Sequence, residues 1–282
     1  MQVFDNKLEK LRLQKLLFLY NRLQTDPSFH FVPYKYGCFS FQAMADKSAL
    51  IKDGYLENSK NWKLNLKDAN FIHTLNETDR KILINIKQKY GSASTEDLIR
   101  QVYLNYPYFA INSEIASKYL NEQEISIINS FKPQNLSECI FTIGYEGRSL
   151  ERYLNILIQQ NIKVLCDVRK NPLSRKYGFA KRTLQNACES LNIKYIHLPE
   201  LGIISEKRQS LNSQKDYDDL FIDYEKVTLP NQSKAILLIK SLIKTYNRVA
   251  LTCYEASPKQ CHRTRVANAV HSLDEDIPIK HL

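Results

Sequence analysis

Four short apolar segments in the second half of the chain run directly into residues that can do acid–base or phosphate chemistry. Carboxylates in such positions activate water, and arginines bind phosphate oxygens in pairs. We therefore predict a single polar site where the ends of segments 140–145, 164–169, 194–201 and 249–255 meet. The groups that these ends deliver are Tyr145, Glu146, Arg148, Asp167, Arg169, Pro172, Ser174, Arg175, Glu200, Cys253, Glu255, His262 and Arg263.

Asp167 and Glu255 are the carboxylates best placed to act as general bases, and Glu146 is a further catalytic candidate. Simpler interpretations exist for the first two. Asp167 and Arg169 stand two residues apart, so both project to one side of a strand and can form a plain ion pair. Glu255 shares its side of the strand with Cys253 and can equally cap the following loop. The sequence leaves both interpretations open.

Basic residues gather around the second apolar segment. Arg169 and Arg175 flank a turn at Pro172, a position suited to phosphate recognition, although a solvated surface would explain part of the cluster. The turn from Gly144 to Gly147 leaves a helix start that can hold an anion, but the chain has no G-x-x-x-x-G-K-[ST] sequence. The basic cluster comprises Arg148, Arg169, Lys170, Arg175, Lys176, Lys181 and Arg182.

The net charge of +10 points to an anionic partner. Residues 1–138 hold 18 Lys and Arg against 15 Asp and Glu, whereas residues 139–282 hold 22 against 15. The larger excess therefore lies in the half that carries the predicted site. Nucleic acid or a nucleotide is the expected partner, and a basic charge that serves solubility alone is the simpler alternative.

Cys253, Cys261 and His262 form a C-x7-C-H pattern. A structural zinc site needs a second ligand pair, which this pattern lacks, so we predict no metal and no cofactor. Cys253 at a strand end also suits a thiol nucleophile. Glu255 and Pro258 disfavour that role, because a nearby carboxylate raises the pKa of a thiol and repels anionic substrates. A cysteine-based enzyme is the weaker alternative.

The apolar segments alternate with amphipathic helical patterns and, later, a polar insertion. This order indicates a mostly parallel sheet covered on both faces, a three-layer Rossmann-like α/β domain over residues 139–282. Ligands of such sheets bind beyond the carboxyl ends of the strands. The expected helices lie at 148–160, 180–191, 216–227, 233–246 and 263–273.

The first half, residues 1–132, is expected to be a smaller, mainly helical domain, with a linker near Pro133. Small helices closed by a short ribbon fit a winged-helix DNA-binding domain, and they fit a helical protein-interaction module equally well. The expected helices lie at 7–23, from 41 to a stop at Gly54, at 77–90 and at 96–107, with a turn or short ribbon at 27–40.

The second half resembles the family called domain of unknown function 488 over most of residues 140–275. The likeness rests on TIGYEGRSLERYL, DVRKNPLSRKYGFAK, YIHLPELG and CYEASPKQCHR, in that order. The family implies an α/β fold and a pocket built from these motifs, with no settled reaction. Many relatives carry histidine where this chain has Tyr145. The resemblance makes pocket candidates of Tyr145, Glu146, Asp167, Arg169, Pro172, Ser174, Arg175, Glu200, Glu255, His262 and Arg263.

Stretches of the first half, between residues 13 and 57, resemble helical antitoxin-like domains of the SocA and Panacea type. They read LQKLLFL, FVPYKYGCFS and DGYLE. Because such domains pair with toxins or effectors, the resemblance implies a protein partner for this half. It also makes a role in phage defence a hypothesis for the whole chain.

Composition narrows the class of protein further. No apolar run approaches the roughly 18–20 residues of a membrane span, and residues 1–10 lack the layout of a signal peptide. Six cysteines without a C-x-x-C pair fit a reducing compartment. We therefore expect a cytoplasmic globular protein with no membrane partner.

These observations favour a hydrolase that acts on a glycosidic or phosphoester bond of nucleic acid or a nucleotide. Asp167 or Glu255 would activate water, while Tyr145 and Phe179 would stack on a base. The alternative is a non-catalytic regulator whose carboxylates hydrogen-bond a bound nucleotide. In either case the phosphate-binding candidates are Arg169, Arg175 and Arg263.

Overall fold

The computed structural model of the protein describes residues 1–65, 70–204, 206, 211 and 213–282. It divides into two compact units, Met1–Lys132 and Pro133–Leu282. The polar insertion expected before residue 216 lies partly outside the described residues. Within the described ranges, none of the helices combines the length and apolar character needed to cross a membrane.

The N-terminal unit is mainly helical, as predicted. Ser40, Asn76 and Ser94 fix the starts of three helices, because each side chain accepts a hydrogen bond from the backbone N–H three residues further on. The helices are α1 (Lys10–Leu23), α2 (Phe41–Lys52), α3 (Glu77–Tyr90), α4 (Thr95–Asn105) and α5 (Glu122–Ser130). Two antiparallel ribbons pair β1 (Lys7–Leu8) with β4 (Trp62–Lys63) and β2 (Val32–Tyr34) with β3 (Gly37–Phe39).

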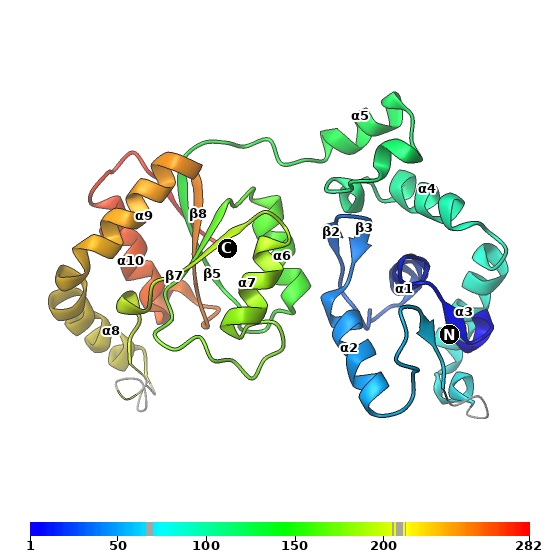
Figure 1. Cartoon of the computed structure of the whole chain (residues 1–282). Coiled ribbons are helices and arrows are strands. Elements are labelled where there is room, and N and C mark those ends of the chain that lie inside the picture. The colour runs from blue at the N-terminus through cyan, green and yellow to red at the C-terminus, as the bar shows by residue number, and fades with distance from the viewer. Residues whose placement is uncertain (66–69, 205, 207–210, 212) are drawn as a thin grey trace. The chain divides into compact units, whose positions relative to one another are not determined.

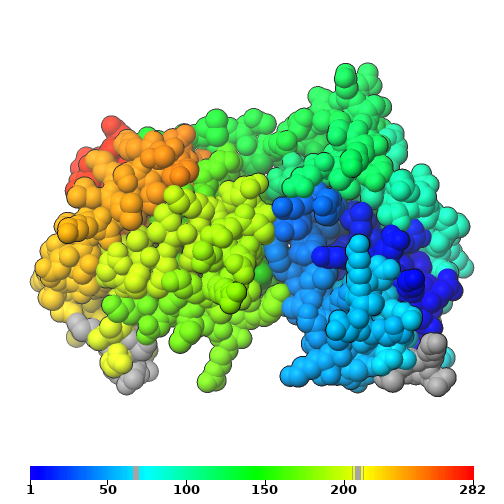
Figure 2. Space-filling view, viewed as in Figure 1, coloured from blue at the N-terminus to red at the C-terminus, as the bar shows by residue number. Residues whose placement is uncertain are grey.

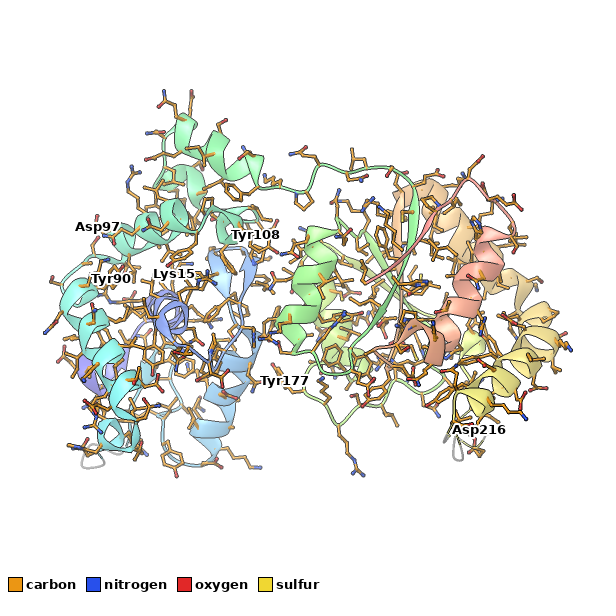
Figure 3. The ribbon with its side chains drawn as sticks, turned by 180° about the vertical axis from the view of Figure 1, so that it is seen from behind. Lys15, Tyr90, Asp97, Tyr108, Tyr177 and Asp216 are labelled. Atoms are coloured by element: carbon orange, nitrogen blue, oxygen red, sulfur yellow. The ribbon has the colours of Figure 1, made fainter. Side chains whose placement is uncertain are left out.

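A buried lysine lies inside the N-terminal unit. Lys15 on α1 is fully buried, and its Nζ donates hydrogen bonds to the carbonyl oxygen of Tyr36 and to Cys38 Sγ at 3.7 Å. Figure 3 shows it in the interior of the unit, beside β2 and β3. Burial lowers the pKa of Lys15, and the neighbouring Cys38 partly offsets this effect.

The C-terminal unit is a three-layer α/β domain, which confirms the predicted fold class. In its described part, five parallel strands form one sheet in the order β7-β6-β8-β5-β9. Figure 1 shows α6 and α7 on one face and α9 and α10 on the other. The strands are β5 (Cys139–Gly144), β6 (Val164–Asp167), β7 (Lys194–His197), β8 (Arg248–Cys253) and β9 (Ile279–His281). The helices are α6 (Leu150–Gln159), α7 (Lys181–Glu189), α8 (Gln214–Asp223), α9 (Ser233–Tyr246) and α10 (His262–His271).

Some predicted boundaries are wrong, and local chemistry explains them. The strand expected at 194–201 ends at His197, because Pro199 has no N–H for the ladder and begins a 3₁₀ turn (Pro199–Leu201). The helix expected at 216–227 starts earlier, at Gln214, and continues through a π-helical turn (Tyr224–Thr228). The strand β9 was not predicted; it is short and has a lysine and a histidine among its three residues.

The core of this unit lies between the sheet and its helices. Every residue of β5, β6 and β8 is buried, as expected for central strands covered on both faces. Val164 and Leu251 from the sheet share one apolar cluster with Ile239 on α9 and Val266 on α10. Each such side chain contributes roughly 1.5–3 kcal/mol through burial. Figure 2 shows α8 and α9, in yellow to orange, on the outside of this face.

The strand order leaves a crevice at the carboxyl end of β8. This strand lies between β6 and β5, whose following connections lead to α7 and α6 on one face. The connection after β8 leads instead to α10 on the opposite face. Loops that leave neighbouring strands toward opposite faces diverge, and this divergence makes room for a ligand at the carboxyl ends of the strands.

Candidate functional site

A pocket of about 470 Å³ lies at these strand ends. Its walls come from the end of β8, from the segments that follow β5, β6, β7 and β8, and from the first residue of α10. This size falls in the range of ordinary small-ligand sites. The lining residues are Tyr145, Arg169, Lys170, Asn171, Leu173, Ser174, Arg175, Lys176, Ile203, Cys253, Tyr254, Glu255 and His262.

A buried ion pair forms one side of the pocket. The carboxylate of Asp167 accepts hydrogen bonds from Arg169 Nε at 2.8 Å and from Arg169 Nη2 at 2.5 Å. The hydroxyl of Tyr195 donates a further bond to the same carboxylate, also at 2.5 Å. Both oxygens of Asp167 are therefore occupied, and its side chain is fully buried. The simpler of the two interpretations, a structural ion pair, describes this contact.

Arg169 is held in place along its whole guanidinium group. Its Nη1 donates to the hydroxyl of Tyr145 at 3.0 Å and to the carbonyl oxygen of Phe179 at 2.9 Å. Burial alone would lower the pKa of Arg169, but the hydrogen bonds and the charge of Asp167 raise it above its ordinary value. Arg169 is therefore permanently protonated and fixed beside the pocket, and the carboxylate of Asp167 balances its charge.

Two aromatic rings support this arrangement. The rings of Tyr145 and Phe179 are stacked, with centroids 4.3 Å apart and planes 8° from parallel. The ring of Tyr254 meets Tyr145 edge-on at 5.3 Å. Phe179 is fully buried behind Tyr145, so it supports the tyrosine and does not itself reach the pocket. Tyr145 and Tyr254 are the aromatic surfaces that a ligand can contact.

Hydrogen bonds and one close backbone approach hold the loop that follows β8 in place. Arg263, which is fully buried, donates hydrogen bonds to the carbonyl oxygens of Glu255 at 2.6 Å and Ala256 at 3.1 Å. Glu146 accepts a bond from the backbone N–H of Ala256 at 2.9 Å. A Cβ at Gly144 would lie 1.8 Å from the carbonyl oxygen of Glu255, so only glycine allows this approach. These contacts set the position of Glu255 in the pocket wall.

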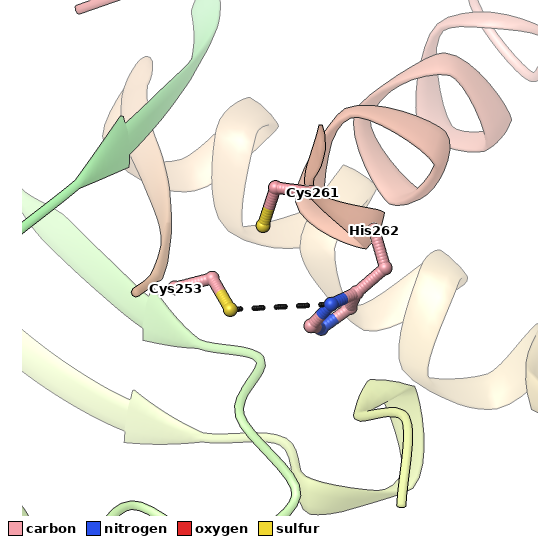
Figure 4. Close-up of side chains that lie close together, drawn as sticks. All are labelled: Cys253, Cys261 and His262. Atoms are coloured by element: carbon pink, nitrogen blue, oxygen red, sulfur yellow. Dashed lines mark hydrogen bonds between the residues drawn. The ribbon is translucent and has the colours of Figure 1, made fainter. Parts of the chain in front are cut away.

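Cys253, Cys261 and His262 meet beside the pocket (Figure 4). Their ligand-type atoms all lie within 4.8 Å of one another, and Cys253 Sγ lies 3.9 Å from His262 Nδ1. The other ring nitrogen, Nε2, lies 2.9 Å from the carbonyl oxygen of Val168. Burial raises the pKa of Cys261 well above its ordinary value, and the neighbouring Cys253 adds to the rise.

The charges that line the pocket are unequal. Arg169, Lys170, Arg175 and Lys176 contribute cations, whereas Glu255 contributes a carboxylate. Lys176 Nζ also donates to the carbonyl oxygen of Tyr145 at 3.0 Å, which holds it against the wall. A pocket with this balance attracts anions.

Comparison with known proteins adds a family. Residues 149–270 match the model of the family described as domain of unknown function DUF488. The C-terminal unit is a DUF488 domain. No curated protein and no solved structure matches the chain. The match begins after Tyr145 and Glu146 and ends before β9, so part of the pocket and an edge of the sheet lie outside the matched residues.

The DUF488 domain brings half of the predicted site residues to the pocket. Seven of them line it, from four separate stretches of the chain, and their role as ligand contacts stays a prediction. These are Tyr145, Arg169, Ser174, Arg175, Cys253, Glu255 and His262.

The other predicted residues do not line the pocket. Asp167, Phe179 and Arg263 are fully buried and support residues that do. Glu146 is exposed and anchors the loop after β8, while Glu200 lines a neighbouring hollow of about 210 Å³. The remaining two are Arg148, which is half-buried, and Pro172, which is buried.

Six residues of the pocket wall were not predicted as site residues. Lys170 and Lys176 belong to the basic cluster around the second apolar segment, so a signal was present for both. Tyr254 stands inside the quoted CYEASPKQCHR motif. Asn171, Leu173 and Ile203 carry no charge or reactive group, and nothing in their types marks them.

Proposed function

We propose that the DUF488 domain binds a nucleotide, either free or within nucleic acid, and hydrolyses it. The observation that carries the proposal is the lining of the pocket, in which Arg169, Lys170, Arg175 and Lys176 face a single carboxylate, Glu255. Phosphate is the anion for which arginine and lysine side chains are best suited. Tyr145 and Tyr254 supply aromatic surface for a base in the same pocket.

Different cations have different tasks in this proposal. Arg169 donates one N–H from Nε, two from Nη1 and one from Nη2 to protein acceptors, and Asp167 balances its charge, so it mainly shapes the pocket wall. Lys170 and Arg175 are exposed on the loop after β6, where their side chains can close on a phosphate group. The pocket therefore has a buried, ion-paired arginine in its wall and an exposed rim of positive charge.

Glu255 is the proposed general base. It is the carboxylate in the pocket lining, and Arg263 and Gly144 fix its backbone. Asp167 is the less suitable candidate because both of its oxygens already accept hydrogen bonds. We therefore assign Asp167 the positioning of Arg169 and Glu255 the activation of water.

The N-terminal unit is proposed to bind a protein partner. Its pocket of about 440 Å³ has mostly apolar walls that include Tyr34, Tyr36, Phe39 and Ile115. Exposed apolar surface of this kind fits a partner side chain or helix. All six cysteines are free thiols, which supports a cytoplasmic location for the assembly.

Glu255→Gln tests the catalytic step. Purified protein is incubated with free nucleotides and with single- and double-stranded DNA and RNA, and released base, phosphate and cleaved strands are measured. The variant should lose turnover by roughly 10²- to 10⁴-fold, the usual contribution of general-base catalysis, and keep its affinity. Glu189→Gln is the matched control, since this exposed carboxylate lies on α7 outside the lining and accepts a hydrogen bond from Gln185 of the same helix. Full turnover in Glu255→Gln would exclude this assignment.

A binding-only outcome is also distinguishable. If wild-type protein binds a nucleotide at the pocket but forms no product, the domain is a non-catalytic regulator. Binding at the pocket is established when Arg175→Ala weakens it and Arg182→Ala, on α7 outside the lining, does not.

A further inference from the structure

Two thiols and an imidazole converge at the edge of the pocket. Cys253 ends β8, whereas Cys261 directly precedes α10 and His262 is the first residue of that helix. Each of the three side chains is at most 2% exposed. Figure 4 shows all three pointing toward a common centre. Thiolate and imidazole are the donor types that bind Zn²⁺ most firmly in proteins.

The surroundings prepare His262 as a ligand. The carbonyl oxygen of Val168 can only accept a hydrogen bond, so Nε2 of His262 carries the proton. It donates a hydrogen bond to that oxygen, 2.9 Å away. The lone pair is therefore on Nδ1, which faces Cys253 Sγ. A carbonyl that holds the distal nitrogen in this way is the usual support of a metal-bound histidine.

The spacing also suits a single ion. Cys253 Sγ and His262 Nδ1 are 3.9 Å apart, close to the roughly 3.5 Å that a sulfur and a nitrogen keep on a tetrahedral zinc ion. The whole triangle fits within 4.8 Å. A thiol nucleophile fits less well, because Cys253 is only 1% exposed and has a second thiol group, that of Cys261, as a close neighbour.

We propose that Cys253, Cys261 and His262 form a Zn²⁺ site whose fourth position faces the pocket. Two of the ligands, Cys253 and His262, line the pocket, whereas Cys261 lies behind them. Binding converts both thiols to thiolates and releases two protons to solvent, while His262 stays neutral. The two thiolate charges balance the ion, so the buried site carries no net charge.

An open fourth position has a consequence for the hydrolysis. Three protein ligands with a water in the fourth place is the pattern of catalytic zinc, in which the ion lowers the pKa of that water. Glu255 lines the same pocket and can accept the proton. This step rests on the proposed function, whereas the metal site itself does not.

The site is tested on the full chain by Co²⁺ titration. Protein freed of metal and kept reduced with a non-thiol reductant is titrated with Co²⁺, and thiolate-to-cobalt charge-transfer absorption is followed. We expect saturation at one ion per chain and loss of the absorption when Zn²⁺ is added. If all six thiols are reduced and no charge-transfer absorption forms, the site does not exist.

Variants assign the ligands. Cys253→Ser, Cys261→Ser and His262→Asn should each lower Zn²⁺ affinity by at least about 10- to 100-fold, since even the outer partners of metal ligands have effects of this size. Cys188→Ala is the matched control, because this buried cysteine lies on α7 outside the triangle. Absorption that persists in both serine variants would overturn the assignment. Circular dichroism tests whether each variant is folded. If a variant is unfolded, the Co²⁺ titration of the wild-type protein decides whether the metal site exists.

The experiments distinguish a failure of the proposed metal site from a failure of the proposed hydrolysis. One bound ion per chain without turnover of any nucleotide supports the site and counts against the proposed function. Turnover that is unchanged after a chelator has removed the ion overturns the water-activating step and leaves the function standing.

Discussion

The carboxylate of Asp167 accepts hydrogen bonds from Nε and Nη2 of Arg169, and one of its oxygens also accepts a hydrogen bond from the hydroxyl of Tyr195. The burial of this cluster raises the pKa of Tyr195, and the charge of Asp167 raises it further. His197 lies on the next strand, with Nε2 2.9 Å from the carbonyl oxygen of Arg169. A charge that would be costly to bury alone is thus fixed at the pocket by residues of two neighbouring strands, β6 and β7.

Asp167→Ala should destabilise the chain by roughly 3–5 kcal/mol, because it leaves the buried Arg169 charge without its partner. Urea unfolding followed by circular dichroism measures the change. The double variant Asp167→Leu, Arg169→Met removes both charges and should lose clearly less stability. Equal losses in the two variants would show that the ion pair is not the source of the effect.

Arg175→Ala should weaken nucleotide binding by roughly 10- to 100-fold, the range expected for a hydrogen bond between charged groups. For a nucleic acid it should also reduce the slope of log affinity against log salt by about one. Fluorescence anisotropy across a salt series measures both quantities. Arg182→Ala is the control, and an equal effect there would indicate a diffuse charge effect instead of a defined phosphate contact. Because Arg175 is exposed, its loss should change stability by less than about 0.5 kcal/mol.

Alkaline pH should destabilise the C-terminal unit through its buried thiols. Burial raises the pKa of Cys166 to about 12 from an ordinary value of 9.0. The unfolded chain therefore releases this proton first. Stability is complete below about pH 9 and falls above it by roughly 1.4 kcal/mol per pH unit per such thiol until the folded thiol also ionises.

Urea titrations at a series of pH values test this expectation. Cys166→Ala should have a lower stability at neutral pH, because it leaves a small cavity, but a flatter decline above about pH 9. A decline as steep as that of the wild-type protein would assign the loss to other groups, such as Tyr195 or Cys188.

Gly144→Ala should push the Glu255 loop away from β5, since the added methyl group would meet the Glu255 carbonyl oxygen at 1.8 Å. We expect a loss of roughly 1–3 kcal/mol and a pocket that no longer holds Glu255 in position. Gly147→Ala is the comparison, because its Cβ meets no atom within 4 Å and its φ of +71° costs only about 1–2 kcal/mol. Ligand binding and turnover should fall in the first variant and persist in the second.

The sequence predicts the C-terminal fold well because its signals are local. The strands β5, β6 and β8 are continuous apolar runs, and helices with an apolar stripe separate them. The short strand β9 escapes prediction, because Ile279, Lys280 and His281 acquire strand geometry only by pairing with β5. The resemblance of the N-terminal unit to antitoxin-like domains stays a prediction.

The site is harder to predict because the depth of a side chain is a tertiary property. Asp167, Arg263 and Lys15 look like surface charges in sequence, yet all three are fully buried. Likewise, seven residues of chain separate Cys253 from Cys261, and only the fold shows that the loop between them returns to the same point. Spacing in sequence does not reveal distances among side chains, so the expectation of no metal could not take account of the triangle on which the proposed site rests.

The division between a buried anchor and an exposed rim has an evolutionary consequence. Asp167 and Arg263 lie in the core, whereas Lys170 and Arg175 project from one surface loop. Substitutions on that loop can alter which ligand is preferred without disturbing folding, so related chains can diverge in specificity while they keep one scaffold. Differences between relatives in residues 170–176 should then track differences in what they bind.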